Sequence, residues 1–265
     1  MSYVAWFSAG VTSAVACKLA IQRYGDVRLF YFETGTAHPD NARFIADCER
    51  WYGKPIETRH NGKYQNQFDV YRKTRFLRGP SGARCTLELK KNVRFAIQQE
   101  LGDWQGQVFG FEFIQKEVNR AIRFNEQYPD AKAVFPLIES KLTKANCIGL
   151  LEAAGIELPV MYQLGYHNNN CIGCVKGGQG YWNKIRVDFP DVFTEMVKVE
   201  AELGRTCLRS QKKPLPLAEL KPDAGRHDVG LEGDCTGFCD IEFADVVDPR
   251  TAKVLSGEML VSECR

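Results

Sequence analysis

Short apolar runs of β-forming residues alternate with helical stretches along the first 155 residues, and this alternation constrains the fold more than any other feature. The β-type runs cover residues 3–7, 27–32, 54–59, 108–111 and 133–137. Helical segments are expected near residues 14–21, 39–51, 90–101, 117–127 and 143–154. Strands and helices that alternate in this way build a mostly parallel sheet with helices on both faces. The sequence therefore predicts an α/β fold around a mostly parallel, twisted sheet.

The sequence changes character after residue 155, where glycines, cysteines and turn-forming residues replace the regular alternation. A length of 265 residues is also long for one average domain and short for two. We expect an α/β domain over residues 1–165. Residues 166–265 would then hold a cysteine loop, one helix near residues 193–203 and a C-terminal extension.

The composition is that of a folded globular protein, with 44% hydrophobic and 26% charged residues. The longest apolar run is far shorter than the roughly 20 residues of a membrane-spanning helix, and the N-terminus lacks the basic segment of a signal peptide. A formal net charge of +2 creates no overall field that would mark a nucleic-acid-binding protein. We therefore expect a cytoplasmic protein with no membrane partner.

Ten cysteines are many for a cytoplasmic chain, in which thiols stay reduced and disulfide frameworks are rare. Cys171 and Cys174 form a C-x-x-C pair, and Cys235 and Cys239 form a second close pair. Such pairs indicate metal ligands or redox chemistry. Three further cysteines fall in apolar helical segments and are expected in the core: Cys17, Cys48 and Cys147.

A loop of small residues joins the first predicted strand to the first predicted helix. It reads Ser8-Ala9-Gly10-Val11-Thr12-Ser13. Backbone N–H groups at the start of a helix favour an anion such as a phosphate group. An ordinary tight turn between a strand and a helix is the alternative interpretation. The loop matches neither G-x-x-x-x-G-K-[ST] nor G-x-G-x-x-G, which disfavours both of those nucleotide-binding families.

The loop resembles the phosphate-binding loop S-G-G-x-D/T-S of the adenine-nucleotide α-hydrolase superfamily. This superfamily includes the phosphoadenosine-phosphosulfate reductases and adenylating thiolation enzymes. Later segments resemble further family motifs in the same order, over about residues 1–190. Glu33-Thr34-Gly35 resembles D-T-G, and Cys85 with Lys90 resembles C-x-x-x-x-K. Gly110 with Glu117 and Arg120 resembles G-x-R-x-x-E-S-x-R, and Pro136-Leu137 with Thr143 resembles P-L-x-x-W-T. The segment from Leu158-Pro159 through Cys171 and Cys174 resembles the run that ends in C-x-x-C.

The resemblance implies that the loop Ser8–Ser13 binds the phosphate groups of ATP or of a related adenine nucleotide. It also implies a set of binding positions and a set of catalytic positions. The binding positions are Glu33, Thr34, Gly35 and Gly110, and the catalytic positions are Ser13, Lys90, Glu117 and Arg120. Val11 stands where many members have a lysine, so we expect Mg²⁺ and basic residues such as Lys90, Arg84 or Arg120 to neutralise the phosphates.

The resemblance further implies that Cys85 approaches Cys171 and Cys174, so that three cysteines bind a [4Fe-4S] cluster. The fourth ligand would be an exogenous sulfur or a cysteine of the tail, such as Cys235 or Cys239. A tetrahedral zinc site made of the two cysteine pairs is the rival interpretation. The sequence does not separate the two metals.

Three functions follow from these motifs. The preferred hypothesis is an adenylating sulfurtransferase, in which an acceptor oxygen attacks the α-phosphate of ATP, pyrophosphate leaves and sulfur then displaces AMP. The second is a reductase of phosphoadenosine-phosphosulfate or adenosine-phosphosulfate with a cysteine nucleophile. Cys264 keeps only part of the E-C-G-x-H tail that holds this nucleophile in the reductases, which favours the first hypothesis.

The third hypothesis is a nucleotide-binding accessory protein without turnover, held rigid by zinc. The acceptor is left open between a nucleic acid and a small molecule. A sulfur-donor protein and a second copy of the chain in a homodimer are further candidate partners.

Overall fold

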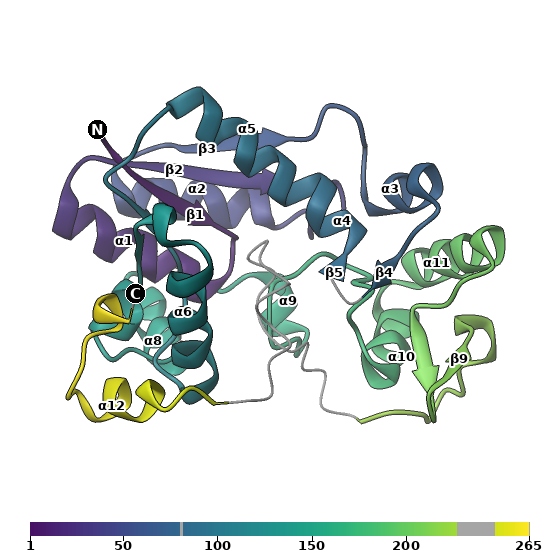
Figure 1. Ribbon diagram of the computed structural model, residues 1–265. Coiled ribbons are helices and arrows are strands. Elements are labelled where there is room, and N and C mark those ends of the chain that lie inside the picture. Colours follow the sequence, from purple (N-terminus) through teal and green to yellow (C-terminus); the bar gives the residue numbers. More distant parts are fainter. Residues whose placement is uncertain (80–81, 227–246, 265) are drawn as a thin grey trace.

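The computed structural model describes residues 1–79, 82–226 and 247–264. Within these residues, five strands form a central sheet in the order β3-β2-β1-β6-β7 (Figure 1). The strands are β1 (Tyr3–Phe7), β2 (Val27–Glu33), β3 (Ile56–His60), β6 (Gly106–Val108) and β7 (Ala133–Val134). Every neighbouring pair in this sheet is parallel. The predicted α/β fold with a parallel sheet is therefore confirmed.

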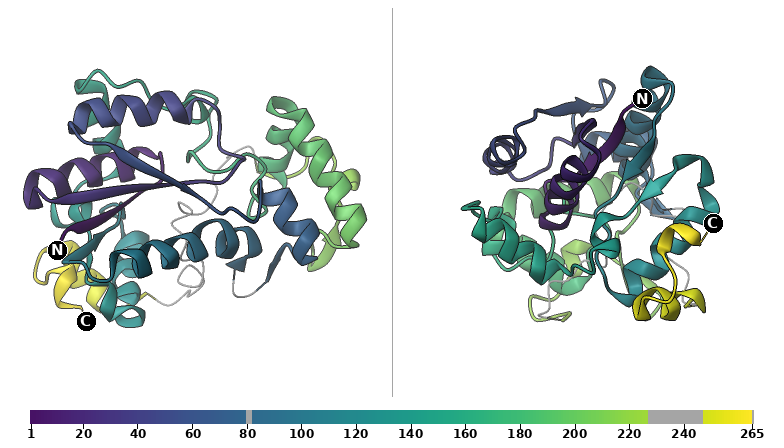
Figure 2. Two further views of the ribbon diagram at one scale, coloured as in Figure 1. Left: turned by 90° about the horizontal axis from the view of Figure 1, so that it is seen from above. Right: turned by 90° about the vertical axis from the view of Figure 1, so that its left-hand side faces the viewer.

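Helices cover both faces of the sheet (Figure 2). One face packs against α1 (Val11–Tyr24), α2 (Asn41–Tyr52), α7 (Pro136–Glu139) and α8 (Lys144–Ala153). The other face packs against α5 (Asn92–Leu101) and α6 (Gln115–Gln127). Next to α6 lie the 3₁₀ turn η2 (Pro129–Ala131), the helix α12 (Arg250–Ser256) and the 3₁₀ turn η5 (Val261–Glu263).

The sequence of the central strand β1 is apolar without a break because the strand is buried on both faces. Ala5 and Phe7 point into the core formed with α1 and α2, whereas Val4 and Trp6 point into the core formed with α5 and α6. Successive side chains of a strand point to opposite faces, so a strand buried on both faces needs apolar residues at every position.

A second, smaller lobe lies beyond one end of the sheet, on the right in Figure 1. Its core combines residues 64–89 with residues 161–220, which are far apart in the sequence. Its longer elements are α3 (Gln67–Thr74), α10 (Gln179–Asp188) and α11 (Pro190–Leu203), and the single turn α9 (Val160–Gln163) places Met161 in the same core. Its short elements are the hairpins β4 (Arg78–Gly79)–β5 (Gly82–Ala83) and β8 (Leu208–Ser210)–β9 (Lys213–Leu215), the turn α4 (Arg84–Thr86), the π-helical turn η1 (Leu87–Lys91) and the 3₁₀ turn η3 (Leu217–Glu219). The division of the chain at residue 165 stays a prediction.

Several boundaries differ from the sequence-based expectation: the strand expected at residues 108–111 is Gly106–Val108, for example, and the helix α10 was not expected. The strand expected at residues 133–137 is only Ala133–Val134, because Pro136 begins a helix. The loop expected at residues 177–180 ends at Gly178, and α10 begins at Gln179. Gly178 has an extended backbone and caps this helix without a side chain. Glycine-rich sequence therefore marks the start of a helix here and not an extended loop.

The strand order reverses between β1 and β6. The chain runs from β1 to β2 and β3 on one side, and then returns to place β6 and β7 on the other side. At such a reversal the connections leave the carboxyl ends of two adjacent strands in opposite directions, and this opens a crevice that commonly binds ligands. Residues 8–10 follow β1 and Phe109-Gly110 follow β6, so these two segments border the crevice.

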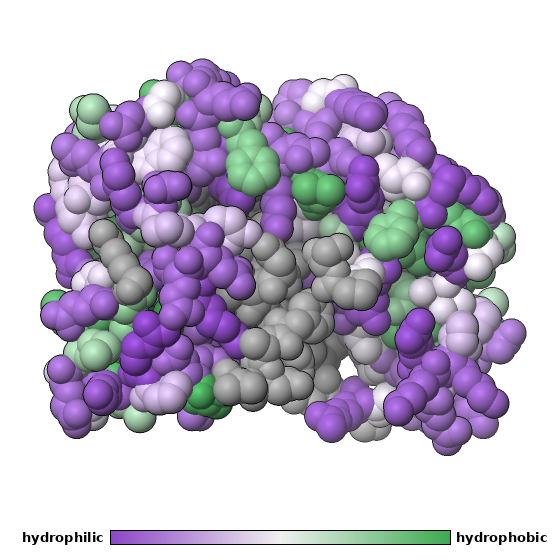
Figure 3. All heavy atoms as spheres, in the orientation of Figure 1, coloured by the Kyte–Doolittle hydropathy of each residue, from purple (hydrophilic) through white to green (hydrophobic). Residues whose placement is uncertain are grey.

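The outer surface is mainly hydrophilic in the view of Figure 3, with apolar side chains in small separate groups. None of the helices in the described part of the chain is long and apolar enough to cross a membrane.

Candidate functional site

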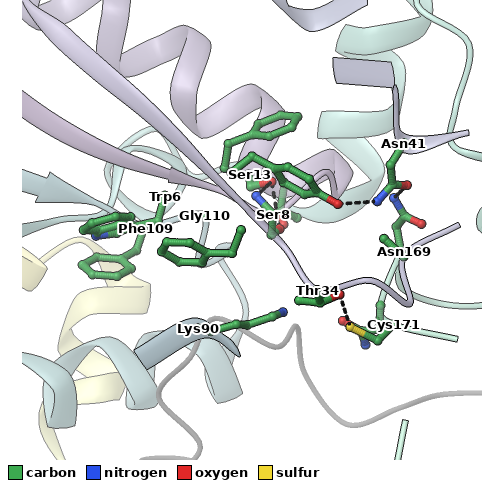
Figure 4. A pocket seen from close by; sticks show the side chains of 16 residues that line it. Trp6, Ser8, Ser13, Thr34, Asn41, Lys90, Phe109, Gly110, Asn169 and Cys171 are labelled. Atoms are coloured by element: carbon green, nitrogen blue, oxygen red, sulfur yellow. Dashed lines mark hydrogen bonds between the residues drawn. The ribbon is translucent and has the colours of Figure 1, made fainter. Parts of the chain in front are cut away.

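A pocket opens at the crevice between β1 and β6 (Figure 4), and we call it the loop pocket. Ser8, Thr12 and Ser13 of the predicted phosphate loop line one side. Thr34 at the end of β2 and Gly110 after β6 line the adjacent sides. The remaining wall consists largely of aromatic side chains and asparagine side chains: Trp6, Phe7, Tyr31, Phe32, Phe109, Asn41, Asn169 and Asn170.

The side chain of Ser13 closes the loop. Its hydroxyl oxygen lies 3.1 Å from the Ser8 backbone nitrogen, whose N–H it accepts, and 3.0 Å from the Ser8 hydroxyl. It donates in turn to the Gly10 carbonyl at 2.9 Å. The first turn of α1 contains no acidic residue, and its N-cap residue Gly10 has no side chain to cap it. The Val11 N–H donates to the Tyr162 hydroxyl at 3.4 Å. The partial positive charge of this helix end therefore faces the loop pocket without a carboxylate of its own, which favours an anion there.

Two small residues shape the loop. Ala9 is fully buried and has a positive φ of 59°, a conformation that glycine adopts more readily than alanine. This explains why the family pattern has glycine at this position. A Cβ added to Gly110 would lie 2.8 Å from both the Cα and the nitrogen of Ser13. Only glycine fits where the segment after β6 packs against the loop.

A chain of amide groups joins the loop to α2. The Asn169 side-chain nitrogen donates to the Ala9 carbonyl at 2.8 Å and to the Asn41 side-chain oxygen at 2.7 Å. Asn41 donates to the Tyr31 hydroxyl at 3.1 Å. The Asn169 Oδ1 atom is buried and has no hydrogen-bond partner in the described structure. A ligand donor in the loop pocket would satisfy this acceptor.

The segment Glu33-Thr34-Gly35 lies at the end of β2, as the motif predicted. Gly35 has a positive φ of 71°, and a Cβ at this position would lie 2.0 Å from the Gln65 carbonyl oxygen. The Gly35 N–H donates to the Glu33 carboxylate at 2.8 Å. Thr34 lines the loop pocket, whereas Glu33 and Gly35 are not among its lining residues. Their position indicates that they set the turn after β2.

A second pocket adjoins the first, and we call it the cysteine pocket. Cys85, Cys171 and Cys174 all line it, and all three are half-buried. Four residues line both pockets: Thr34, Lys90, Asn170 and Cys171. The Thr34 hydroxyl lies 3.0 Å from the Cys171 sulfur across this shared wall. The loop and the C-x-x-C pair, which are about 160 residues apart in sequence, therefore meet in space.

The C-x-x-C turn is held by buried side chains of the second lobe. The Tyr181 hydroxyl accepts from the Gly173 and Cys174 N–H groups at 3.0 Å each, and donates to the Cys171 carbonyl at 3.3 Å. The Gln67 side chain donates to the Gly173 carbonyl at 3.1 Å. Burial raises the pKa of Tyr181 well above its usual value, so the hydroxyl keeps its proton and stays a donor.

The metal predictions have different outcomes for different residues. Cys85, Cys171 and Cys174 line the same pocket, but no group of three or more His, Cys, Asp or Glu side chains in the described residues is arranged to hold a metal ion. The described arrangement therefore does not form a closed metal site. The other predicted ligands, Cys235 and Cys239, lie outside the described residues.

Lys90 reaches both pockets from the π-helical turn η1. Such turns are uncommon and occur frequently at functional sites. Burial raises the pKa of the nearby Tyr31 hydroxyl to about 12, and the positive charge of Lys90 opposes this rise. Arg84, another cation expected to neutralise phosphates, lines neither pocket and pairs with Glu88 at 2.8 Å. Lys90 is thus the cation that both pockets share.

Glu117 and Arg120, predicted as catalytic from the family motif, lie on α6. They form an ion pair at 3.3 Å, and the Arg120 guanidinium lies over the Phe111 ring at 4.4 Å. Both side chains are buried, and neither is among the lining residues of the two pockets. Their catalytic roles stay predictions that rest on the motif.

The other cysteines are placed as core residues. Cys17, Cys48 and Cys147, which we call the core cysteines, are buried against the α1, α2 and α8 face of the sheet, as predicted. Burial raises the pKa of both Cys48 and Cys147 to about 12. Cys264 is 1% exposed, packs in the core beside α6 and donates to the Met259 sulfur at 3.4 Å.

Sequence reasoning missed the amides and aromatic residues of the site. The only sequence signal for Asn169 was the run Asn168-Asn169-Asn170, which directly precedes the C-x-x-C pair. Tyr181 and Trp182 stand among the basic residues Lys176, Lys184 and Arg186, and the sequence leaves open whether they form a surface for a stacked base or pack under the cysteine turn. They are 3% and 0% exposed, so they pack under the cysteine turn and offer no stacking surface.

The fold and the site together define an α/β protein in which the loop after β1 lines a pocket at the point where the strand order reverses. The profile of the phosphoadenosine phosphosulfate reductase domain matches residues 2–178, which is more than half of the chain, and the chain belongs to this family. No curated protein matches the chain. The family match includes the loop, Lys90 and the C-x-x-C turn, and it confirms the resemblance seen in the motifs.

Proposed function

We propose that this chain is an adenylating sulfurtransferase that binds ATP in the loop pocket and transfers sulfur at the cysteine pocket. The observation that carries the proposal is the wall shared by the two pockets, formed by Thr34, Lys90, Asn170 and Cys171. Group transfer between two bound species requires their reacting atoms to be held within a few ångströms of each other. Adjacent pockets for a nucleotide and for sulfur meet this requirement.

The loop pocket suits an adenine nucleotide in three respects. The N-terminus of α1 and the loop N–H groups favour the phosphates. Aromatic side chains such as Trp6 and Phe109 offer an apolar surface for the base. The buried Asn169 Oδ1 atom can accept from an amino or hydroxyl group of the nucleotide.

In the proposed reaction, an acceptor oxygen attacks the α-phosphorus of ATP, and the bond to the β-phosphate oxygen breaks to release pyrophosphate. Sulfur in the cysteine pocket, supplied by a sulfur-donor protein, then attacks the acceptor carbon. The C–S bond forms, the C–O bond breaks and AMP leaves with that oxygen. Lys90, which reaches both pockets, would stabilise the charge on the phosphates in both steps. Mg²⁺ and an iron–sulfur cluster stay predictions.

A sulfonucleotide reductase is the second candidate, and one observation favours it: Cys171 lines the loop pocket itself. Its thiolate would attack the sulfur of an activated sulfate, breaking the bond from sulfur to the phosphate oxygen and releasing the nucleotide. Cys174 would then attack Cys171, which releases sulfite and forms a disulfide. The C-terminal Cys264 does not support this reaction, because it is buried beside α6.

The two candidates are separated by purifying the full chain without oxygen and incubating it with either nucleotide. We expect pyrophosphate and AMP from ATP with an acceptor and a sulfide source, and no sulfite from phosphoadenosine phosphosulfate. The Ser13→Ala variant should lower nucleotide turnover, since Ser13 closes the loop. Iron and sulfide analysis of the same protein tests the predicted cluster, and one zinc per chain without iron would support the zinc alternative. Sulfite formation without pyrophosphate would reverse the order of the two candidates, and no turnover of either nucleotide would refute both.

A further inference from the structure

A third cavity, of about 260 Å³, lies at the opposite edge of the sheet from the loop pocket, and we call it the rear pocket. Its residues include Trp104, just before β6, and Ala131, just before β7, so it lies near the amino ends of these strands. The loop pocket lies at the carboxyl ends. One water occupies about 30 Å³ of liquid, so the rear pocket has room for several waters or for a single-ring compound.

Several side chains with N–H donors line the rear pocket, and two of them, Gln107 and Arg94, are buried. Gln107 is 1% exposed, and its side-chain nitrogen is buried with no hydrogen-bond partner in the described structure. Leaving a buried N–H₂ group unsatisfied costs roughly 1–3 kcal/mol, so such a group in a cavity wall points to a bound acceptor. Arg94, which is 3% exposed, places a guanidinium in the same wall. A carboxylate offers acceptors for an amide and a cation together.

The other walls are aromatic. Trp104 and Tyr128 line the rear pocket, and Phe95 lines it with 45% of its surface exposed. The Trp104 ring is fixed by its indole N–H, which donates to the Ala131 carbonyl at 3.3 Å. Aromatic walls favour a planar ring. Asp130 is the acidic residue of the lining, and it is exposed to solvent, which screens its charge.

Gln107 also connects the rear pocket to the loop pocket. Its side-chain oxygen accepts from the Trp6 indole N–H at 2.9 Å and from the Gln98 side chain at 3.1 Å. Trp6 lines the loop pocket. A ligand that binds the Gln107 nitrogen therefore acts on the amide that positions Trp6.

We propose that the rear pocket binds a small planar aromatic carboxylate, and that Gln107 transmits its binding to Trp6. The carboxylate accepts from Gln107 and pairs with Arg94, while the ring packs against Trp104 and Tyr128. An effect of this ligand on nucleotide affinity would depend on the proposed function, namely nucleotide binding in the loop pocket. Ligand binding in the rear pocket and the response of Trp6 do not depend on that function.

The test uses the full chain labelled with ¹⁵N and follows its four tryptophan indole N–H signals by NMR, each assigned with a Trp→Phe variant. Benzoate is the probe, and benzyl alcohol is the matched compound without a carboxylate. We expect benzoate to shift the signals of Trp104 and Trp6 and to leave those of Trp51 and Trp182 in place. Benzyl alcohol should produce no shift at the same concentration.

The Gln107→Glu variant keeps an oxygen for Trp6 but replaces the N–H₂ donor with an acceptor, so benzoate affinity should fall at least about tenfold. Gln105→Glu, an exposed position two residues earlier, is the matched control and should bind as the parent does. If Gln107→Glu does not fold, Trp104→Leu replaces it in a calorimetric titration with the same expected loss.

An unmoved Trp104 signal at about 10 mM benzoate, where single-ring ligands of ordinary efficiency bind, would overturn the proposal. Equal shifts with benzyl alcohol, or unchanged affinity in Gln107→Glu, would also overturn it. A shift of Trp104 without Trp6 would overturn the transmission through Gln107. None of these outcomes depends on nucleotide turnover.

Discussion

Removal of one hydroxyl group should loosen the C-x-x-C turn without touching a cysteine. The Tyr181 hydroxyl satisfies three backbone groups, the N–H groups of Gly173 and Cys174 and the carbonyl of Cys171. Tyr181 is 3% exposed, so water does not replace the hydroxyl in Tyr181→Phe. The bond to the Gly173 N–H is buried, and the other two are partly buried. A buried group left without a partner costs roughly 1–3 kcal/mol and a partly buried one costs less, so the variant should lose about 3 kcal/mol of unfolding free energy.

Tyr166→Phe is the matched control for this variant. Tyr166 is equally buried in the same core and lies 5.9 Å from Tyr181 between ring centroids. Its hydroxyl makes one partly buried bond, to Asp188 at 2.8 Å, and Asp188 keeps its ion pair with Lys184 in the variant. The loss should therefore cost about 1.5 kcal/mol, the lower end of the range for a bond to a charged group. Urea unfolding of both variants and the parent measures the difference.

Tyr181→Phe and its control also separate the two proposed chemical steps, which are the release of pyrophosphate and the transfer of sulfur. A 1 Å misplacement of a reacting group costs about a hundredfold in rate, so Tyr181→Phe should slow sulfur transfer strongly. Pyrophosphate release should change little, because the loop pocket keeps its contacts. Equal stability of the two variants, or equal loss of both steps in Tyr181→Phe, would refute the reasoning that the hydroxyl positions the sulfur-bearing turn.

Four further predictions follow from the site. Gly110→Ala should abolish nucleotide binding in a calorimetric titration, since its Cβ would meet the loop backbone. Gly149→Ala, in an open helical position, should instead raise the unfolding free energy measured in urea by up to about 1 kcal/mol. Ala9→Gly should relieve the positive φ, keep nucleotide affinity and change stability by no more than about 1 kcal/mol in urea unfolding. Lys90→Met should weaken ATP binding about tenfold in a titration, while Lys90→Arg keeps most of it. At pH 8 the core cysteines, which are buried and have pKa values raised by burial, should resist iodoacetamide in mass spectrometry as long as the chain is folded. The half-buried cysteines of the cysteine pocket should react under the same conditions, and equal labelling of both sets would contradict this prediction.

The sheet and the phosphate loop were predictable because their signals are local. An apolar run buried on both faces, small residues and an alanine-rich helix occur together within residues 3–21. The motifs also placed Thr34 and Gly110 at the ends of strands that border the crevice. These predictions needed only the order of elements and the rule that parallel strands end at the same edge.

The second lobe was not predictable from local patterns. Its core joins residues 64–89 to residues 161–220, and the hydrophobic periodicity within either segment does not predict that it packs against the other. The sequence left open whether Tyr181 and Trp182 lie on the surface or pack under the cysteine turn, and this long-range packing buries them. Asn169 has its role because the chain brings it to the Ala9 carbonyl, 160 residues away in sequence.

Calorimetric titration of the full chain with ATP and MgCl₂ tests the central claim that the loop pocket binds a nucleotide. We expect one ATP per chain, and affinity at least about tenfold lower in the Ser13→Ala variant, whose loop loses the bonds to Ser8 and Gly10. Absence of binding at millimolar ATP, or equal affinity in parent and variant, would contradict the account.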